Sequence, residues 1–246
     1  MIQIRPTEGL PEIEEGSPLG LMIATAAEPG DDDVVVISQK VVSKAEGRTV
    51  DLGTVEPSER AQELAFRVEK KPELVELVLA ESREVLRAGR GVLIVETKSG
   101  LICANAGIDS SNVPGDGRVA LLPVDPDASA RRLRAEIQAA SGSRPAVLIV
   151  DSFGRPWRLG QTEIAIGCAG LRVLDDWRGM QDRDGRKLGA TVIAIADEIA
   201  AAADLARDKA SGAPVVIVSG VERHITGDDG PGAAALRRAE ERDLFR

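Results

Sequence analysis

Three short runs of apolar residues stand out along the chain, at positions 33–38, 146–150 and 214–219. Their length and their β-branched composition predict strands that are covered on both faces. The alternating polarity of the first few residues predicts one more short strand. Two further apolar segments, at 92–96 and 101–105, flank a Lys-Ser-Gly turn and predict a β-hairpin.

Apolar residues at helical spacing predict helices between these strands. Ser58 is placed to cap a helix over 59–69, and Pro72 suits the first turn of the next helix, which runs to about residue 86. Gly142 marks the end of a helix that begins at Ser129. The remaining predicted helices cover residues 19–26, the alanine-rich stretch 191–210, which is the longest, and the charged C-terminus after a mobile-looking loop at 220–230.

The predicted strand 146–150 ends in a group of polar residues. Asp151 and Ser152 follow it directly, and Arg155 and Arg158 come a few positions later. Ligands collect at the carboxyl ends of strands in α/β proteins, and carboxylate and hydroxyl oxygens suit Mg²⁺ or Mn²⁺. The arginines could then meet phosphate oxygens. The alternative is that Asp151 and Ser152 simply cap a turn or a helix.

A second polar stretch follows the hairpin. It contains Asn105, Asp109, Ser110, Ser111 and Asn112 between two glycine-containing turns. Such residues form ordinary Asx turns, but they also supply oxygen ligands for a hard cation and a nucleotide. The second interpretation gains weight if Asp109 faces the carboxylate at position 151, because neighbouring carboxylates repel unless a cation lies between them.

Charged and small residues elsewhere are open to two interpretations. Lys40 and Lys44 follow the strand 33–38 and either bind an anion or solubilise an exposed edge. Asp197 and Glu198 are either directed at a metal or serve as surface and capping charges. The glycines that follow the 146–150 strand favour tight packing over close approach to a ligand; they are Gly160, Gly167 and Gly170.

Composition narrows the possible functions. The 246 residues suffice for one large domain or two small intertwined ones, and with only 2% aromatic residues the core must be mainly aliphatic. A net charge of −9 argues against nucleic acid or an anionic membrane as partner, and no apolar run is long enough to span a membrane. An anionic substrate would need locally placed cations.

The reactive residues exclude several mechanisms. Cys103 and Cys168, with no signal peptide, fit a reducing cytoplasm, and neither has the partner pattern of a zinc site. His224 is the only histidine, which disfavours Ser–His–Asp and Cys–His catalysis. The chain has no P-loop and no strand-linked G-x-G-x-x-G. Any chemistry therefore rests on carboxylates, lysines, arginines and metal.

Four motifs together resemble the coenzyme F420-0:L-glutamate ligase (F420 γ-glutamyl ligase) family. They are SKAEGR at 43–48, NAGIDSSNVPG at 105–115, DSFGRPWRLGQTEIAIGCAGL at 151–171 and ADEIAAAADL at 196–205. The likeness spans nearly the whole chain, with the motifs in the family's order. Agreement of several spaced motifs is a stronger signal than any one of them.

The resemblance implies an α/β (mixed α+β) fold with mixed sheets and flanking helices, in an intertwined cytoplasmic homodimer. It implies GTP-dependent ligation of L-glutamate to F420-0 through an acyl phosphate, giving F420-1, GDP and phosphate, with longer γ-linked tails as an extension. Mg²⁺ or Mn²⁺, with two ions expected, and K⁺ would be cofactors. The chain resembles the stand-alone form, without the flavin reductase domain found fused to some relatives, and is expected to form one unit, with two interleaved subdomains as an option.

The resemblance also implies roles for individual residues. Asp109 is similar to a metal ligand, and Asp151 with Ser152 to a metal-binding pair. With Lys44 balancing charge, Asp109 and Asp151 would align the γ-phosphate with the attacking carboxylate. The positions that match nucleotide-binding segments are Leu10, Pro11, Glu12, Ile13, Gln39, Lys40, Lys44 and Asn112. The loop 220–230 matches a nucleotide-contacting region only loosely.

Two alternatives stay open at this point. A ligase of the same fold could act on another small carboxylic acid, because local residues do not fix the acceptor. A non-catalytic nucleotide-binding homologue is the other alternative. The intact set of Asp109, Asn112, Asp151 and Ser152 argues against the second, since a degenerate homologue is expected to lose one of them.

Overall fold

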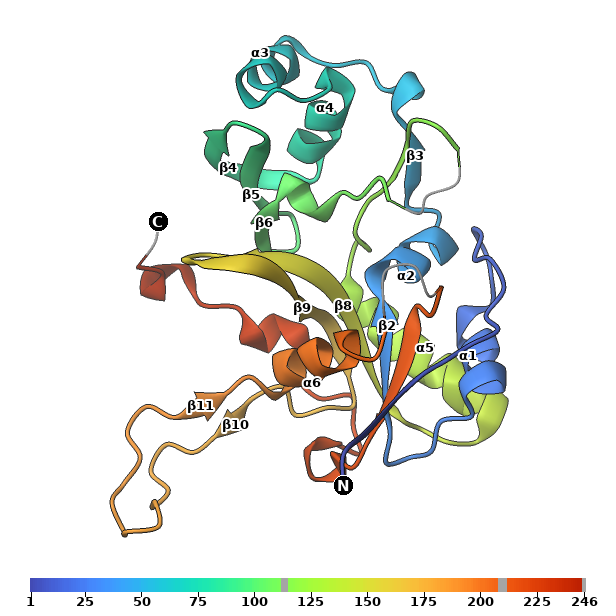
Figure 1. The fold of residues 1–246 in the computed structure, drawn as a ribbon, viewed down its shortest axis with the longest axis vertical. Helices are drawn as coiled ribbons and strands as arrows, with labels where there is room; N and C mark the ends of the chain where they lie inside the picture. Colours follow the sequence, from blue (N-terminus) through green and yellow to red (C-terminus); the bar gives the residue numbers. More distant parts are fainter. Residues whose placement is uncertain (112–114, 208–211, 245–246) are drawn as a thin grey trace.

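The computed structural model describes residues 1–111, 115–207 and 212–244. Its centre is a five-stranded sheet crossing the lower half of Figure 1. Strands β2 and β8 are parallel, and the other neighbouring pairs are antiparallel. In sheet order the strands are β1 (Gln3–Pro6), β12 (Val215–Ser219), β2 (Val34–Ser38), β8 (Ala146–Arg155) and β9 (Arg158–Ala169).

Alternation along the central strands builds a core on each face of the sheet. Val35 and Ile37 face helices α1 (Leu19–Ala27) and α5 (Pro126–Ser141). Val34 and Val36 face the opposite side, which helix α6 (Ile195–Asp204) covers. Side chains in a strand point alternately to the two faces, so a run that is apolar throughout is buried on both. The three apolar runs are the confirmed central strands, and the mixed α/β fold class is confirmed as well.

A smaller unit with its own core lies above the sheet in Figure 1. It is inserted between the short antiparallel strands β3 (Thr49–Asp51) and β7 (Arg118–Ala120). Arg48 connects it to the sheet, because its guanidinium lies 2.6 Å from Glu81 and donates to the Leu122 carbonyl. Its elements are α3 (Glu59–Val68), α4 (Pro72–Ala80), β4 (Ser82–Gly89), β5 (Val92–Thr97) and β6 (Ile102–Ala104).

Three sequence-predicted helices need correction. The helix predicted to run from Pro72 to about residue 86 ends at Ala80, and the following residues pair with β5 as strand β4. The predicted helix over 191–210 begins only at Ile195, because β-branched Val192 and Ile193 form strand β11 (Val192–Ile193), and it ends at Asp204. With 10 residues it is not the longest helix, since α5 has 16. The charged C-terminus forms short 3₁₀ turns, η4 (Ala233–Leu236) and η5 (Glu240–Arg242), where one helix was predicted.

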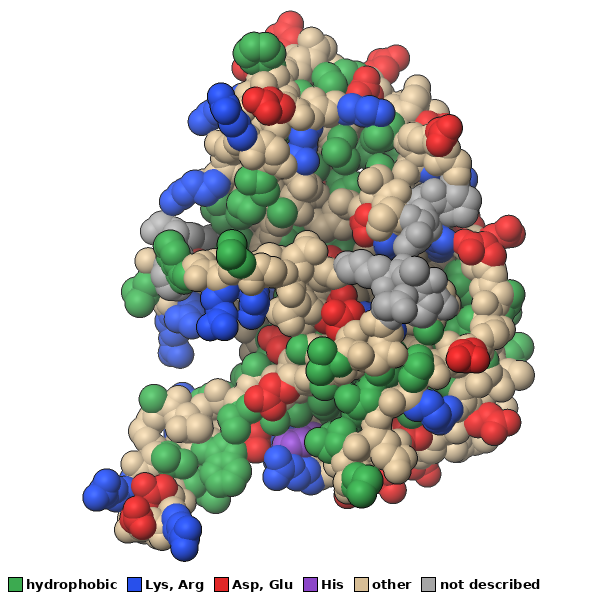
Figure 2. All heavy atoms as spheres, in the orientation of Figure 1, with side chains coloured by type: hydrophobic (Ala, Val, Ile, Leu, Met, Phe, Trp, Pro, Cys, Tyr) green, Lys and Arg blue, Asp and Glu red, His purple; other side chains and the backbone are tan. Residues whose placement is uncertain are grey.

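Strand β11 pairs with β10 (Asp175–Asp176) at the base of a projecting arm. Residues 177–191 form the rest of the arm, which stands away from the body in Figures 1 and 2. Only short pairings hold it, including backbone hydrogen bonds between Gly179 and Leu188 and between Asp182 and Arg186. The β8–β9 hairpin is a second projection on the same side of the molecule.

Other predicted boundaries are confirmed. Ser58 caps α3 by accepting from the Ala61 amide, and Gly142, in a left-handed conformation, ends α5. Two of the three glycines predicted to allow tight packing do so. A side chain at Gly167 would collide with the Pro126 carbonyl, and one at Gly170, just after β9, with the Arg134 guanidinium, whereas Gly160 has only Arg155 nearby, at 3.7 Å.

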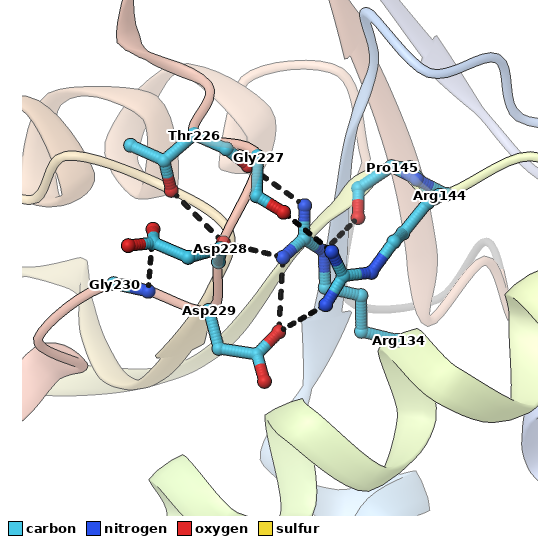
Figure 3. A network of polar contacts seen from close by, with 8 residues as sticks. All are labelled: Arg134, Arg144, Pro145, Thr226, Gly227, Asp228, Asp229 and Gly230. Atoms are coloured by element: carbon cyan, nitrogen blue, oxygen red, sulfur yellow. Dashed lines mark hydrogen bonds and ion pairs between the residues drawn. The ribbon is translucent and has the colours of Figure 1, made fainter.

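The amino end of β8 is fastened by a buried arginine (Figure 3). Arg134 of α5, 2% exposed, donates to the carbonyls of Pro145, Thr226 and Asp228 and lies 2.9 Å from the Asp229 carboxylate. Arg144 donates to the Gly227 carbonyl and lies 3.0 Å from the same carboxylate. The loop 220–230, predicted to be mobile, is therefore tied down by two guanidinium groups.

Candidate functional site

The candidate site lies where β8 extends beyond the end of its parallel neighbour, β2. Strand β2 ends at Ser38, which is paired with Val150, while β8 continues to Arg155 because β9 pairs with it on the other edge. The expectation that the strand ends abruptly at Asp151 is therefore wrong, and so is the alternative that Asp151 and Ser152 cap a turn or helix. Both residues lie within a paired strand, just past the carboxyl end of β2.

Asp151 is in an electrostatically unfavourable position. Burial is the main cause that raises the pKa of its carboxyl group, to about 7, and the negative charges of Glu163 and Asp109 add to it. The Ser152 amide and Lys40 oppose the shift without cancelling it. A carboxylate held among other carboxylates in a partly buried place gains from a nearby cation.

Asp109 reaches this place from the loop after β6. Its backbone pairs with Ala120 in both directions, at 2.8 and 3.0 Å, and its carboxylate accepts from the Ser111 amide at 2.7 Å. Burial alone would raise the pKa of Asp109, but the hydrogen bonds from Ser111 and Lys40 outweigh it and lower the pKa. The negative charge of Asp109 raises the pKa of Asp151, so the loop after β6 and strand β8 bring the two carboxylates within electrostatic range of each other.

Lys40 is a cation that acts on both carboxylates. Helix α2 (Gln39–Ala45) follows β2 at once, so Lys40 lies at the same edge of the sheet as Asp151. Its ammonium is 2.9 Å from the Asp109 carboxylate and 2.8 Å from the Ser111 hydroxyl. The lysine is thus part of a charged cluster, and the alternative of a solubilising charge on an exposed edge does not describe it.

The other nucleotide-binding candidates are spread around α2. Lys44 pairs with Glu12 at 2.5 Å, which joins α2 to the N-terminal loop. Gln39 is only 1% exposed, and its carbonyl oxygen accepts from the Ser43 hydroxyl, while its amide nitrogen has no hydrogen-bond partner among the described residues. Ile13 is a core residue at 4% exposure. Of the rest of that loop, Leu10 is half-buried and packs on the same core, and Pro11 is exposed.

Two candidates stand apart from this cluster, and a third, Asn112, lies outside the described residues. Arg155 donates to the carbonyls of Leu159 and Gly160 in its own hairpin turn, and this use explains its position without a phosphate. The loop 220–230 follows β12, which runs antiparallel to β2, so the loop lies at the opposite edge of the sheet.

His224 lies in that distant region as well. Strand β12 ends at Ser219, whose hydroxyl bonds to Asp33 at the start of β2, and His224 comes five residues later in η3 (Glu222–His224). Burial and the neighbouring Arg223 lower the pKa of His224. The only histidine is thus not among the residues near Asp151, in keeping with a mechanism that needs no histidine base.

Two residues of the cluster were not predicted from the sequence. Glu163 on β9, 6% exposed, accepts from the Ser152 hydroxyl at 2.6 Å. Arg207, after α6, lies 3.2 Å from the other carboxylate oxygen of Glu163. Glu163 lies where the polar first half of β9 passes into its apolar second half. A Glu beside an apolar run was the available signal, because such a residue is rarely buried without a partner. The Asp197 carboxylate accepts a hydrogen bond from the Ala165 amide at 2.9 Å and so connects α6 to β9.

The donor set determines what the cluster can bind. Among the described residues, no group of three or more His, Cys, Asp or Glu side chains is arranged as a metal cage. The carboxylates of Asp109 and Asp151 fit Mg²⁺ or Mn²⁺ in another way, whereas the side chain of Ser152, the next residue of β8, points to the other face of the sheet. These ions are commonly held by one or two carboxylates together with substrate phosphates and water. The residues therefore fit a cation that arrives with a phosphate-bearing substrate.

Comparison with known proteins gives a consistent result. Residues 9–220 match the family model described as F420-0:Gamma-glutamyl ligase. Proteins named Coenzyme F420:L-glutamate ligase are similar over the full chain: that of Methanothermobacter thermautotrophicus is 42% identical over 251 residues, covering 100% of this chain and 99% of its own. That of Archaeoglobus fulgidus is 43% identical over 246 residues, covering 100% and 96%. No helix within the described residues is long and apolar enough to cross a membrane.

Proposed function

Because this chain belongs to the F420-0:gamma-glutamyl ligase family, we propose that it forms the amide bond between L-glutamate and coenzyme F420-0. Relatives that carry the ligase name cover 96–100% of the chain at 40–43% identity. The single observation that supports this assignment in the structure is the convergence of Asp109, Asp151 and Lys40 at the carboxyl edge of the sheet.

GTP is the proposed source of energy. A carboxylate is a poor acyl donor, so the F420-0 carboxylate would first take the γ-phosphoryl group to give an acyl phosphate and GDP. The amine of glutamate would then attack the acyl carbon and release phosphate. Positioning and charge stabilisation supply most of the catalysis in phosphoryl transfer, which suits a site without a histidine.

Each residue of the cluster has a proposed part in this reaction. Asp109 and Asp151 would hold Mg²⁺ or Mn²⁺, which when bound neutralises phosphate oxygens and orients them. Lys40, at the start of α2, would contact the same phosphates, and Lys44 would balance the remaining negative charge. Two divalent ions and K⁺ are part of the proposal, but no described residue is assigned to K⁺.

A product assay tests the proposed function. The protein would be incubated with F420-0, GTP, Mn²⁺ and L-glutamate, and the products analysed by mass spectrometry. We expect a product heavier than F420-0 by one glutamyl residue, or by several, with one GDP released per bond. GDP release that does not require both F420-0 and glutamate would contradict the proposal, and product formed only with a different carboxylic acid would identify another acceptor.

A homodimer is also proposed. The β8–β9 hairpin and the arm 175–193 project from the body in Figure 2 and carry exposed apolar side chains. Trp157 is 85% exposed, Leu159 is 96% exposed and Met180 is 55% exposed. Large exposed apolar groups on projecting elements favour contact with a second copy. Light scattering on the purified protein should give twice the mass of the chain, and Leu159→Asp should lower it.

A further inference from the structure

A cavity of about 230 Å³ lies where the smaller unit meets the body of the sheet. Its two walls are formed by Glu81, Lys98 and Ala106 of the smaller unit and by Arg48, Leu122 and Val124 of the body. Small-molecule sites occur preferentially at such junctions. The cluster proposed to bind the cation and the phosphates shares none of these residues, so the cavity is a separate place for a ligand.

Two cationic groups of the lining have unused donors. The Arg48 guanidinium lies 2.6 Å from the Glu81 carboxylate through Nη2 and donates to the Leu122 carbonyl through Nε at 3.0 Å. Among the described residues, its Nη1 group has no hydrogen-bond partner, and the Lys98 ammonium has neither a hydrogen-bond nor an ion-pair partner. Such donors favour a carboxylate or phosphate ligand, because hydrogen bonds between ionised groups are the strong ones.

The rest of the lining is aliphatic. Ala106 is 2% exposed and Leu122 is 6% exposed, while Val124, at 73%, is open to solvent. A volume of about 230 Å³ is below the roughly 300–1,000 Å³ of sites that enclose drug-sized ligands, so the cavity suits a smaller molecule than a nucleotide or a deazaflavin. L-Glutamate has two carboxylates joined by a short aliphatic chain, and it matches both the size of the cavity and its two kinds of lining.

The cavity lies beside the residues proposed to activate the acyl group. Ala106 precedes Asp109 by three residues, which span at most about 11 Å. Leu122 comes two residues after Ala120, whose backbone pairs with that of Asp109. Strand β6, which leads into this loop, contacts β8, the strand of Asp151 (Figure 1). Both carboxylates of the cluster are therefore close to the elements that form the cavity.

We propose that this cavity is the L-glutamate subsite of the proposed ligase. The Lys98 ammonium and the Nη1 group of Arg48 take the two carboxylates of glutamate, and Glu81 keeps Arg48 in position. The amine of glutamate is then the group left to extend toward Asp109 and the acyl phosphate. The inference rests on the proposed function, since it assigns a site to one of the substrates of that reaction.

The test is steady-state kinetics of the full-length protein, with L-glutamate varied at saturating F420-0, GTP and Mn²⁺. Lys98→Met should raise the KM for L-glutamate by about tenfold, the effect of one lost hydrogen bond between charged groups, and leave kcat and the KM for GTP unchanged. Lys98→Arg, which keeps the charge, should have a KM near that of the wild type. Lys71→Met is the matched control, because Lys71 is an exposed lysine of the same unit that does not line the cavity.

A substrate analogue separates binding from chemistry. Glutarate has both carboxylates of glutamate but no amine, so it cannot form the amide and should inhibit competitively with L-glutamate. Lys98→Met should raise the inhibition constant of glutarate by the same factor of about ten.

Three results would overturn the inference. An unchanged KM for L-glutamate in Lys98→Met would leave the cavity without a role in glutamate binding. A rise in the KM for F420-0 in place of that for L-glutamate would assign the cavity to the other carboxylate substrate, and an equal rise in Lys71→Met would reduce the effect to net charge. All three leave the ligase function standing, whereas a wild-type protein that forms no glutamyl product would contradict that function and this inference together.

Discussion

The two ends of β8 hold charged groups in opposite proportions. At the amino end, the guanidinium groups of Arg134 and Arg144 share one carboxylate, Asp229, and backbone carbonyls take up further donors. At the carboxyl end, the described cluster has three carboxylates, Asp109, Asp151 and Glu163, against the cations Lys40 and Arg207. The amino end of β8, the closed end, thus has its charged groups paired within the chain. The carboxyl end, the open end, has an excess of negative charge.

The difference separates a structural role from a reactive one. Arg134 is fully buried, and carbonyls fixed by the fold satisfy its donors, so the amino end has its partners within the chain. At the other end burial raises the pKa of Asp151 because the cations nearby do not balance the carboxylates. A site whose charge is completed by a bound cation is expected to be less favourable when that cation is absent.

The largest expected effect is at the closed end. Arg134→Met should lower the free energy of unfolding by about 3–5 kcal/mol, since it leaves Asp229 and several carbonyls without their buried donor. At roughly 2–4 °C per kcal/mol, calorimetry should show a fall of the order of 10 °C in the unfolding midpoint. Mn²⁺ binding measured well below that midpoint should be unchanged, and a large loss of Mn²⁺ affinity would contradict the separation of the two ends.

The next effect concerns catalysis at the open end. Asp109→Asn and Asp151→Asn should each reduce the rate of GTP-dependent ligation at limiting metal by about 100-fold, equivalent to about 2.7 kcal/mol. Neither substitution should lower the unfolding midpoint of the metal-free protein by more than a few degrees. Normal ligation by both variants would show that the two-carboxylate model is wrong.

The pH dependence of stability sharpens the comparison. The pKa of Asp151 rises from 3.8 to about 7 on folding, so between these values the folded chain binds more protons at this group than the unfolded chain. Its contribution to stability therefore decreases as pH rises from about 4 to 7, by at most about 1.4 kcal/mol per pH unit. Chemical denaturation of the metal-free protein should show this decline relative to Asp151→Asn.

The variant itself supplies the control for that measurement. The lowered pKa of His224 acts in the opposite direction in part of the same range, because its folded form resists protonation. Asp151→Asn keeps His224, so the difference between the two pH profiles isolates the carboxylate. Parallel profiles for the two proteins would place Asp151 in a less unfavourable environment than the structure gives it.

The smallest effect comes from the second arginine of the closed end. Arg144 contacts the same carboxylate as Arg134, but its side chain is 37% exposed where that of Arg134 is 2% exposed. Arg144→Met should therefore lower the free energy of unfolding by about 1 kcal/mol or less. Equal losses for the two variants would mean that burial does not set the strength of this network.

The sequence was sufficient for the central strands and for half of the site. Apolar runs identified β2, β8 and β12. The polar residues after two strands left open whether Asp109 and Asp151 approach each other, and it was the resemblance to the ligase family that assigned both to one metal site. Glu163 was not predicted, because its contact with Ser152 depends on the register of the β8–β9 hairpin, which includes two irregularities. Arg207 lies in a stretch predicted to be helical, and Arg134 lies on one side of an amphipathic helix. The partners of these two arginines could therefore not be predicted from the sequence.

The missed residues share a physical reason. Local periodicity reports which face of an element is buried, but it does not report which distant charge lies opposite. Arg134 donates hydrogen bonds to carbonyls more than 90 positions away along the chain. Glu163 on β9 forms an ion pair with Arg207, which follows α6. Such pairs follow from packing of the whole fold, so they become visible only once the sheet and its helices are placed.

The most direct test of the difference between the two ends is Mn²⁺ binding to wild-type protein and to Asp151→Asn, measured by electron paramagnetic resonance with and without GTP. The account predicts binding by the wild type that GTP strengthens, and a loss of affinity of at least tenfold in the variant under both conditions. Equal affinity of the two proteins for Mn²⁺ would contradict the claim that the carboxyl end of β8 is the cation site.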